Sequence, residues 1–263
     1  MMKKWIVFLT FVALGMALAG VARAETVRGE GRYMEQQITD LMPFHAIDVR
    51  GDAHVDIWQQ GKQSVRVSGK QNLVALANLH VEDQTLIIEF KRPIHIKGAH
   101  ALQVTVTIPE LTTLSVHSDG RARIRGPFEV KNLSLTAADK AEIDGDSIKA
   151  KLLRLQVMNK ADIDLERIQV KKLEAANFDR GNLELSGHAE EARLTNNGHD
   201  DIDAADLRIN SAQVAVNARG DVEVFVMHSL KAQANGSGKI TYHGQPTLTR
   251  GGNMKKIQPA FDD

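Results

Sequence analysis

The sequence contains no cysteine among its 263 residues. Disulfides, thiolate metal sites and thiol nucleophiles are therefore excluded within this chain. Aromatic residues are also scarce, with only two tryptophans and two tyrosines. A platform of rings for stacking sugars usually needs more than that. Any binding function must accordingly rest mainly on polar and charged side chains.

Long apolar runs are missing after residue 24. The run from Trp5 to Ala19 follows two lysines and precedes a small-x-small pattern at residues 22–24. This order is typical of a cleaved secretory signal, and the run is shorter than the ~20 residues of a spanning helix. We predict that residues 1–24 are a signal peptide, cleaved after Ala24, and that the mature chain begins at Glu25. An uncleaved membrane anchor is the alternative. Export leaves the periplasm and the cell surface as destinations.

The chain has no excess of either charge, with 33 basic and 33 acidic residues. Removing the three basic residues of the predicted signal leaves 30 basic against 33 acidic residues. A small negative charge gives no general attraction to nucleic acid or to anionic membranes. No nucleic-acid partner and no transmembrane segment of the mature chain are predicted.

Short runs with two-residue alternation of apolar and polar positions fill most of the mature chain. Examples are "HVDIW", "SVRVSG" and "QVTVTI", and this alternation is typical of strands with one buried face. The best helical candidate is Gln71 to Leu79. Residues 25–43 are polar and lack a clear period, so we expect an exposed arm there. The mature protein is predicted to be all-β.

Apolar residues also recur at a longer interval of about 20 residues. One column reads Ile124, Ile143, Ile163, Leu183, Ile202, Val222 and Ile240. Two more apolar columns lie eight and ten positions upstream and begin at Val116 and Leu114. One unit is too small to bury its apolar face alone, but stacked units form interior ladders at a spacing of ~4.8 Å.

These columns predict a right-handed parallel β-helix, or β-solenoid, with rungs of about 20 residues. The right hand follows from the usual sense of crossover connections. A β-sandwich is the alternative fold. We divide the mature chain into an arm (25–43), an N-terminal β part (44–110), regular rungs (111–248) and a C-terminal cap or tail (249–263). The segment from Gln245 onward is expected to cover the last rung.

The turns between rungs carry a column of basic residues. Its members are Arg121, Lys140, Lys160, Arg180, His199 and Arg219. A column of small residues follows, and the next column is largely acidic. One interpretation is a self-neutralised, solvated edge, since exposed ion pairs contribute only ~0.2–1 kcal/mol each. The other is a ladder of cations that binds an extended acidic glycan.

The chain resembles the family of putative auto-transporter adhesin head GIN domains from about Phe44 to Ile257. The resemblance rests on "FHAIDVRGDAHVDIWQQG", on "VEDQTLIIEF" and on "NGSGKITYHGQP", whose Gly236, Ser237 and Gly238 match the recurrent glycine-serine-glycine turn. Most rungs instead carry "DKA", "NKA" or "DRG", so a shared ligand site does not follow. The resemblance implies a right-handed β-helix with no established catalytic set and a role in adhesion or surface interaction.

An enzyme on this scaffold would need carboxylates that converge on one face. The densest candidate, "GHDDIDAAD", holds His199, Asp200, Asp201, Asp203 and Asp206. Alternation places Asp201 and Asp203 on one outward face, where they could bind calcium or act as an acid/base pair. We favour a solvated strand with polar outward residues, since no HExxH, GxSxG or P-loop motif is present. We predict no catalytic residues, no cofactor and no metal.

The sequence therefore predicts an exported, non-catalytic, adhesin-like interaction protein. A glycan-active β-helix enzyme and a purely structural envelope protein are the two alternatives. Envelope or host glycans or proteins are the expected partners, and the oligomeric state is left open.

Overall fold

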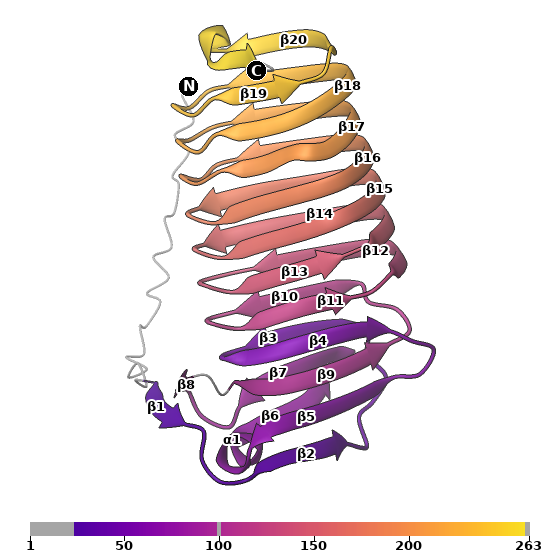
Figure 1. Ribbon diagram of the computed structural model, residues 1–263, viewed down its shortest axis with the longest axis vertical. Coiled ribbons are helices and arrows are strands. Elements are labelled where there is room, and N and C mark those ends of the chain that lie inside the picture. The colour runs from indigo at the N-terminus through magenta and orange to yellow at the C-terminus, as the bar shows by residue number, and fades with distance from the viewer. Residues whose placement is uncertain (1–23, 99–100, 261–263) are drawn as a thin grey trace, which may run out of the picture.

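The computed structural model describes residues 24–98 and 101–260. The predicted signal peptide lies outside these residues except for Ala24. Strands dominate, and they stack along one long axis (Figure 1). About seven stacked turns of roughly 20 residues form a β-solenoid, which confirms the predicted fold class.

The N-terminal part consists of short strands and one short helix. They are β1 (Glu25–Arg28), β2 (Tyr33–Ile38), β3 (Ala46–Arg50), β4 (Ala53–Gln59), β5 (Ser64–Lys70), α1 (Gln71–Leu76), β6 (Ala77–Glu82), β7 (Thr85–Phe90), β8 (Ile94–Lys97) and β9 (Leu102–Ile108). The helix α1 thus lies within the segment predicted as helical. Over the part of the chain that the structure describes, no helix is long and apolar enough to cross a membrane.

The rungs above this part are built from longer strands. They are β10 (Thr113–His117), β11 (Arg121–Arg125), β12 (Phe128–Ala137), β13 (Glu142–Asp146), β14 (Ile148–Asn159), β15 (Asp162–Asp179), β16 (Asn182–Asn196), β17 (Ile202–Val216), β18 (Val222–Ala234), β19 (Ile240–His243), β20 (Thr247–Gly252) and β21 (Ile257–Pro259). A short 3-10 turn, η1 (Met254–Lys256), joins the last two strands.

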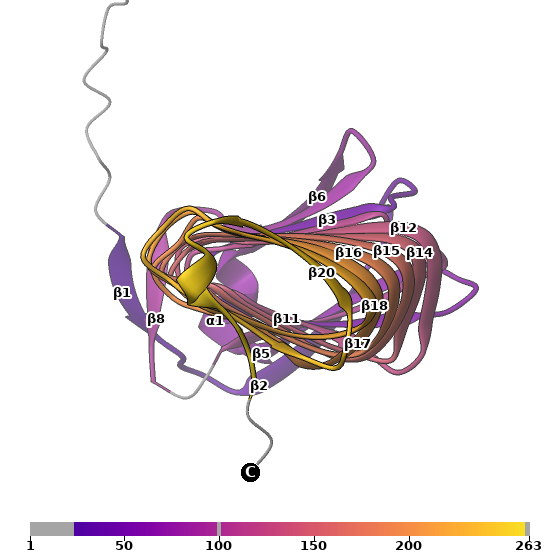
Figure 2. The ribbon, with the colours of Figure 1, turned by 90° about the horizontal axis from the view of Figure 1, so that it is seen from above.

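The stacked strands are parallel and enclose a flattened outline when seen along the axis (Figure 2). Leu133, Leu153 and Leu173 pair in register on successive rungs, and each is at most 2% exposed. Each rung therefore buries its apolar face against its neighbours. A single rung could not do so alone, which is why the repeat must be kept.

The predicted columns are correct from the second rung onward and wrong at the first. Ile143 pairs with Ile163 above it as predicted, but below it pairs with Ala122 instead of Ile124. Likewise Leu135 pairs with Leu114, not with Val116. A shift of two residues leaves every side chain on the same face of its strand, so the apolar pattern cannot detect it.

The N-terminal end of the stack departs from the simple repeat. The predicted arm at residues 25–43 forms two mostly exposed strands: β1 pairs with β8 in a separate two-stranded sheet, and β2 pairs antiparallel with β5. Strands β3 and β4 lie in register with β10 and β11. The solenoid therefore already begins within residues 44–110.

Two asparagines lie fully buried in an interior column at one corner. Asn177 and Asn196 are 0% exposed and face each other on adjacent rungs. Their side-chain amides both donate to the carbonyl of Asp200, at 3.0 and 2.9 Å. These hydrogen bonds stabilise the turn that follows each asparagine. The turn carbonyls would otherwise be buried without a backbone N–H group to donate to them.

Candidate functional site

The predicted basic column lies at the corner where one side of each rung turns into the other. Lys140, Lys160, Arg180, His199 and Arg219 stack there, since the amide of each donates to a turn carbonyl of the rung below. The turn residues that precede them include Asp139, Asn159 and Asp179, whose φ angles are 68°, 61° and 78°. Aspartate and asparagine tolerate this left-handed conformation better than most residues.

Arg121 does not belong to the basic column. It lies within β11, and its Nε is 3.0 Å from Oε2 of Glu142. Asp119 takes the corresponding place at the corner, 3.4 Å from Nζ of Lys140. The cause is the same two-residue shift that displaces the first apolar rung.

Nearby carboxylates partly neutralise the corner column. Besides the Lys140 pair, Oδ1 of Asp179 lies 3.7 Å from Nδ1 of His199 and 3.9 Å from Nε of Arg180. Lys160 and Arg219 have no such partner among the described residues. The corner is thus a mixed-charge edge.

The carboxylates of "GHDDIDAAD" are divided between two places: Asp200 and Asp201 lie in the turn before β17, and Asp203 and Asp206 lie within β17. Asp201 accepts the amide of Asp221 on its Oδ1 at 2.7 Å, and Asp203 accepts the amide of Ala205 at 3.0 Å. These bonds hold local backbone. Asp200, which replaces a small residue of the corner column, is half-buried, and its carbonyl receives the buried asparagine amides.

Asp203 is one member of an acidic ladder on the face formed by β13 and the first halves of the later strands. The members stack in register on five rungs: Asp144, Asp164, Glu184, Asp203 and Glu223. Burial and the charges of Glu184, Glu166 and Asp144 raise the pKa of Asp164 above its usual value. Such a rise is expected where like charges stack without cations between them.

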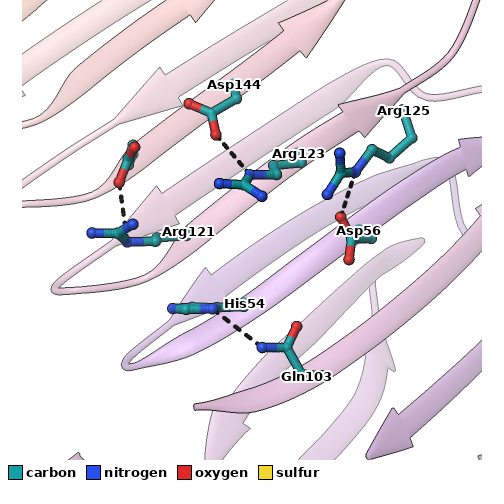
Figure 3. A network of polar contacts seen from close by, with 8 residues as sticks. His54, Asp56, Gln103, Arg121, Arg123, Arg125 and Asp144 are labelled. Atoms are coloured by element: carbon teal, nitrogen blue, oxygen red, sulfur yellow. Dashed lines mark hydrogen bonds and ion pairs between the residues drawn. The ribbon is translucent and has the colours of Figure 1, made fainter. Parts of the chain in front are cut away.

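The N-terminal end of this acidic face is neutralised by arginines of β11, which point from one face of the strand (Figure 3). Nε of Arg123 lies 2.8 Å from Oδ2 of Asp144, and Nε of Arg125 lies 2.7 Å from Oδ1 of Asp56. Below them, burial and the charges of Arg121 and Arg123 lower the pKa of His54. These arginines are occupied by their ion pairs.

A groove lies near the bend of β12, β14, β15 and β16. Its volume is about 770 Å³, and its floor includes Val130, Ala150 and Val170, which pair in register. Its polar lining comprises Gln59, Glu110, Glu129, Lys131, Lys149, Lys151, Gln169, Lys171, His188 and Glu190. We call this surface the lysine groove.

Three exposed lysines follow the floor residues directly and stack along the groove: Lys131, Lys151 and Lys171. Lys149 is paired with Glu129 at 2.9 Å. Among the described residues, no carboxylate lies within ion-pair distance of the three stacked lysines. Their positive charge is therefore available to a ligand.

The sequence contained a signal for this ladder, because lysines at 131, 151 and 171 recur every 20 residues. They lie two positions before the buried leucine column. The repeat alone does not reveal a groove at these positions. From the sequence, the lysine column therefore looks like any other row of solvent-exposed residues.

A family model described as "Putative auto-transporter adhesin, head GIN domain" matches residues 43–246. The chain belongs to this GIN-domain family. Membership confirms the resemblance drawn from the turn and strand motifs. No curated protein matches the chain.

Several solved structures share the GIN-domain fold seen here. A putative lipid binding protein from Parabacteroides distasonis is 21% identical with a TM-score of 0.79, covering 90% of this chain and 100% of that chain. A putative adhesin from the same organism is 22% identical with the same TM-score and coverage. A putative adhesin from Parabacteroides merdae is 20% identical with a TM-score of 0.78, again covering 90% and 100%. At these identities the likeness establishes the fold.

Proposed function

We propose that this GIN domain is an exported, non-catalytic, adhesin-like protein that binds an extended acidic glycan in the lysine groove. The observation that carries the proposal is the ladder of Lys131, Lys151 and Lys171, which have no carboxylate partner among the described residues and line a groove that crosses several rungs. Stacked strands lie ~4.8 Å apart. A linear ligand with repeated negative charges can therefore engage successive lysines at once.

The groove floor adds a second recognition element. Val130, Ala150 and Val170 belong to the buried core and are at most 9% exposed, so the floor contributes only a small apolar area between the charged walls. Ligand sites commonly combine an apolar lining with a few polar groups that fix orientation. A sugar chain has both apolar ring faces and charged substituents, so it matches this combination better than a simple ion does.

A non-catalytic role is supported by where the carboxylates lie. Two carboxylates of the predicted cluster accept hydrogen bonds from backbone amides, so local structure already engages them. General acid/base chemistry requires carboxylates that face one substrate bond. The names of related structures as putative adhesins fit the same role.

Charge-matched variants of the exported chain, residues 25–263, test the proposal. The groove variant carries Lys131→Gln, Lys151→Gln and Lys171→Gln; the corner control carries Lys140→Gln, Lys160→Gln and Arg180→Gln. Both lose three positive charges, but only the first alters the groove. Binding to a panel of acidic and neutral glycans is measured at low and high salt.

We expect the native chain to bind acidic glycans, more weakly at high salt because counterions screen the lysines. Exposed charge pairs contribute ~0.2–1 kcal/mol each, so loss of three should weaken binding by about threefold to about 100-fold. The corner control should bind like the native chain. Loss of binding in the corner control alone would move the site to the corner, and binding that ignores salt and both variants would contradict an electrostatic site.

A further inference from the structure

Three side chains of types that bind metals meet where β8 contacts the corner of the stack. Asp52 comes from the turn between β3 and β4, Asp119 from the turn between β10 and β11, and His95 from β8. Nδ1 of His95 lies 3.0 Å from Oδ2 of Asp52 and 3.4 Å from Oδ2 of Asp119. One donor atom from each residue falls within 4.8 Å of the other two.

The burial of Asp52 makes this cluster unlike an ordinary surface ion pair. Asp52 is only 9% exposed, and its Oδ2 accepts the amide of Ile96 at 2.6 Å. Within the described residues, His95 is the only basic side chain within ion-pair distance of Asp52. Buried carboxylates are normally paired with a cation or coordinate a metal.

The donor set fits a divalent transition metal. In a tetrahedral zinc site the donor atoms lie about 2.1 Å from the ion and hence about 3.4 Å apart. Oδ2 of Asp119 and Nδ1 of His95 have that separation, Oδ2 of Asp52 lies 3.0 Å from Nδ1, and the donor atoms of the two aspartates lie within 4.8 Å of each other. The two carboxylates would also balance the double charge of the ion. Lys140 contacts the other oxygen of Asp119, Oδ1, and so leaves Oδ2 facing His95.

We propose that Asp52, His95 and Asp119 bind a Zn²⁺ ion. A nitrogen donor favours zinc-type metals over calcium or magnesium, which prefer oxygen ligands. The site lies beside a groove of about 550 Å³ lined by Arg50, Arg92, Ser118 and other residues, so a position on the ion stays open to solvent. This proposal does not depend on glycan binding in the lysine groove.

The position of the site indicates what the ion would do. Strands β1 and β8 form a two-stranded sheet that lies beside the stack (Figures 1 and 2). Asp52 and Asp119 occupy corresponding corners of two adjacent rungs, because His54 pairs with Arg121. An ion shared with His95 would tie this small sheet, and with it the start of the exported chain, to two rungs of the solenoid.

Zinc titration of the untagged chain, residues 25–263, tests the site. The ligand variants are His95→Gln and Asp119→Asn. The matched control is His117→Gln, because Nε2 of His117 faces a single carboxylate, that of Asp48, at 3.4 Å. Calorimetry with Zn²⁺ should show one saturable site in the native chain and the control. Each ligand variant should bind at least about tenfold more weakly. Ca²⁺ and Mg²⁺ should not compete.

Amide hydrogen exchange locates the ion without relying on the variants. Zn²⁺ should slow exchange in β1 and β8 of the native chain and leave β20 unchanged. Absence of a stoichiometric zinc site, equal loss of affinity in His117→Gln, or protection elsewhere in the chain would each overturn the proposal. In that case the cluster is a histidine ion pair between two carboxylates.

Discussion

At the scale of single residues, the corner of each rung is set by side-chain size. Gly181 occupies the small-residue column, and a Cβ there would collide with Cγ1 of Val157 and the carbonyl of Ala161. Gly61, in contrast, has no atom within 4 Å of the position its Cβ would take. The two glycines therefore test whether the corner column is selected by close packing or only by turn preference.

Gly181→Ala is expected to destabilise the protein, because the added methyl forces the neighbouring rung to move. Overpacking of this kind typically costs about 1–3 kcal/mol. Gly61→Ala should change the free energy of unfolding by less than about 0.5 kcal/mol, as is usual for open surface positions. Urea denaturation of both variants measures the difference. Equal effects would show that the corner is not tightly packed.

At this scale the sequence predicted which kinds of residue occupy the corner better than it predicted which residues contact one another. The small corner column followed from aligning the 20-residue repeats. The buried pair Asn177 and Asn196 did not, since asparagine in a strand gives no sign of pointing inward. The role of Arg121 was misplaced because a two-residue shift preserves the face on which it lies.

At the scale of elements, charge is arranged in ladders along the stack. Asp164 lies in the acidic ladder, and its pKa in the folded state is raised above the usual 3.8. The folded chain thus keeps a proton on Asp164 at pH values where the unfolded chain has lost it. Stability then decreases as the pH rises through this window. Glu174 shows the opposite sign, because hydrogen bonds from Lys172 and Arg154 lower its pKa below 4.5.

Two substitutions should accordingly have opposite effects at neutral pH. Asp164→Asn removes a repelled charge and should raise the free energy of unfolding at about pH 7, with no gain near pH 3, where the carboxyl is protonated in both states. Glu174→Gln removes a paired charge and should lower the free energy of unfolding at about pH 7. Urea denaturation at both pH values measures these changes. A loss of stability in Asp164→Asn at neutral pH would show that the ladder is not self-repelling.

At the scale of the whole molecule, the repeat determines the fold, and the two ends determine how the terminal strands are covered. The aligned columns predicted the solenoid because burial of each apolar face requires a neighbour at fixed register. The ends have no such period, so the two N-terminal strands were not predicted. The C-terminal segment does cover the last rungs: β20 pairs with β18, and Ile257 of β21 pairs with Ile240 of β19.

Truncation after Gly244 should therefore cause self-association. It removes β20, η1 and β21 and exposes the edges of β18 and β19, whose free amides and carbonyls can pair with another chain. Size-exclusion chromatography with light scattering would compare residues 25–244 with residues 25–263 over a range of concentrations. A truncated chain with the same mass and stability as the full-length one would contradict a capping role.

We propose that ligand binding occurs in the lysine groove and not at the corner. Lysine footprinting by acetylation tests this on the native chain, with and without a saturating acidic glycan. The account predicts that the glycan protects Lys131, Lys151 and Lys171 while Lys140 and Lys160 react as before. Protection of the corner lysines, or no protection at all, would contradict it.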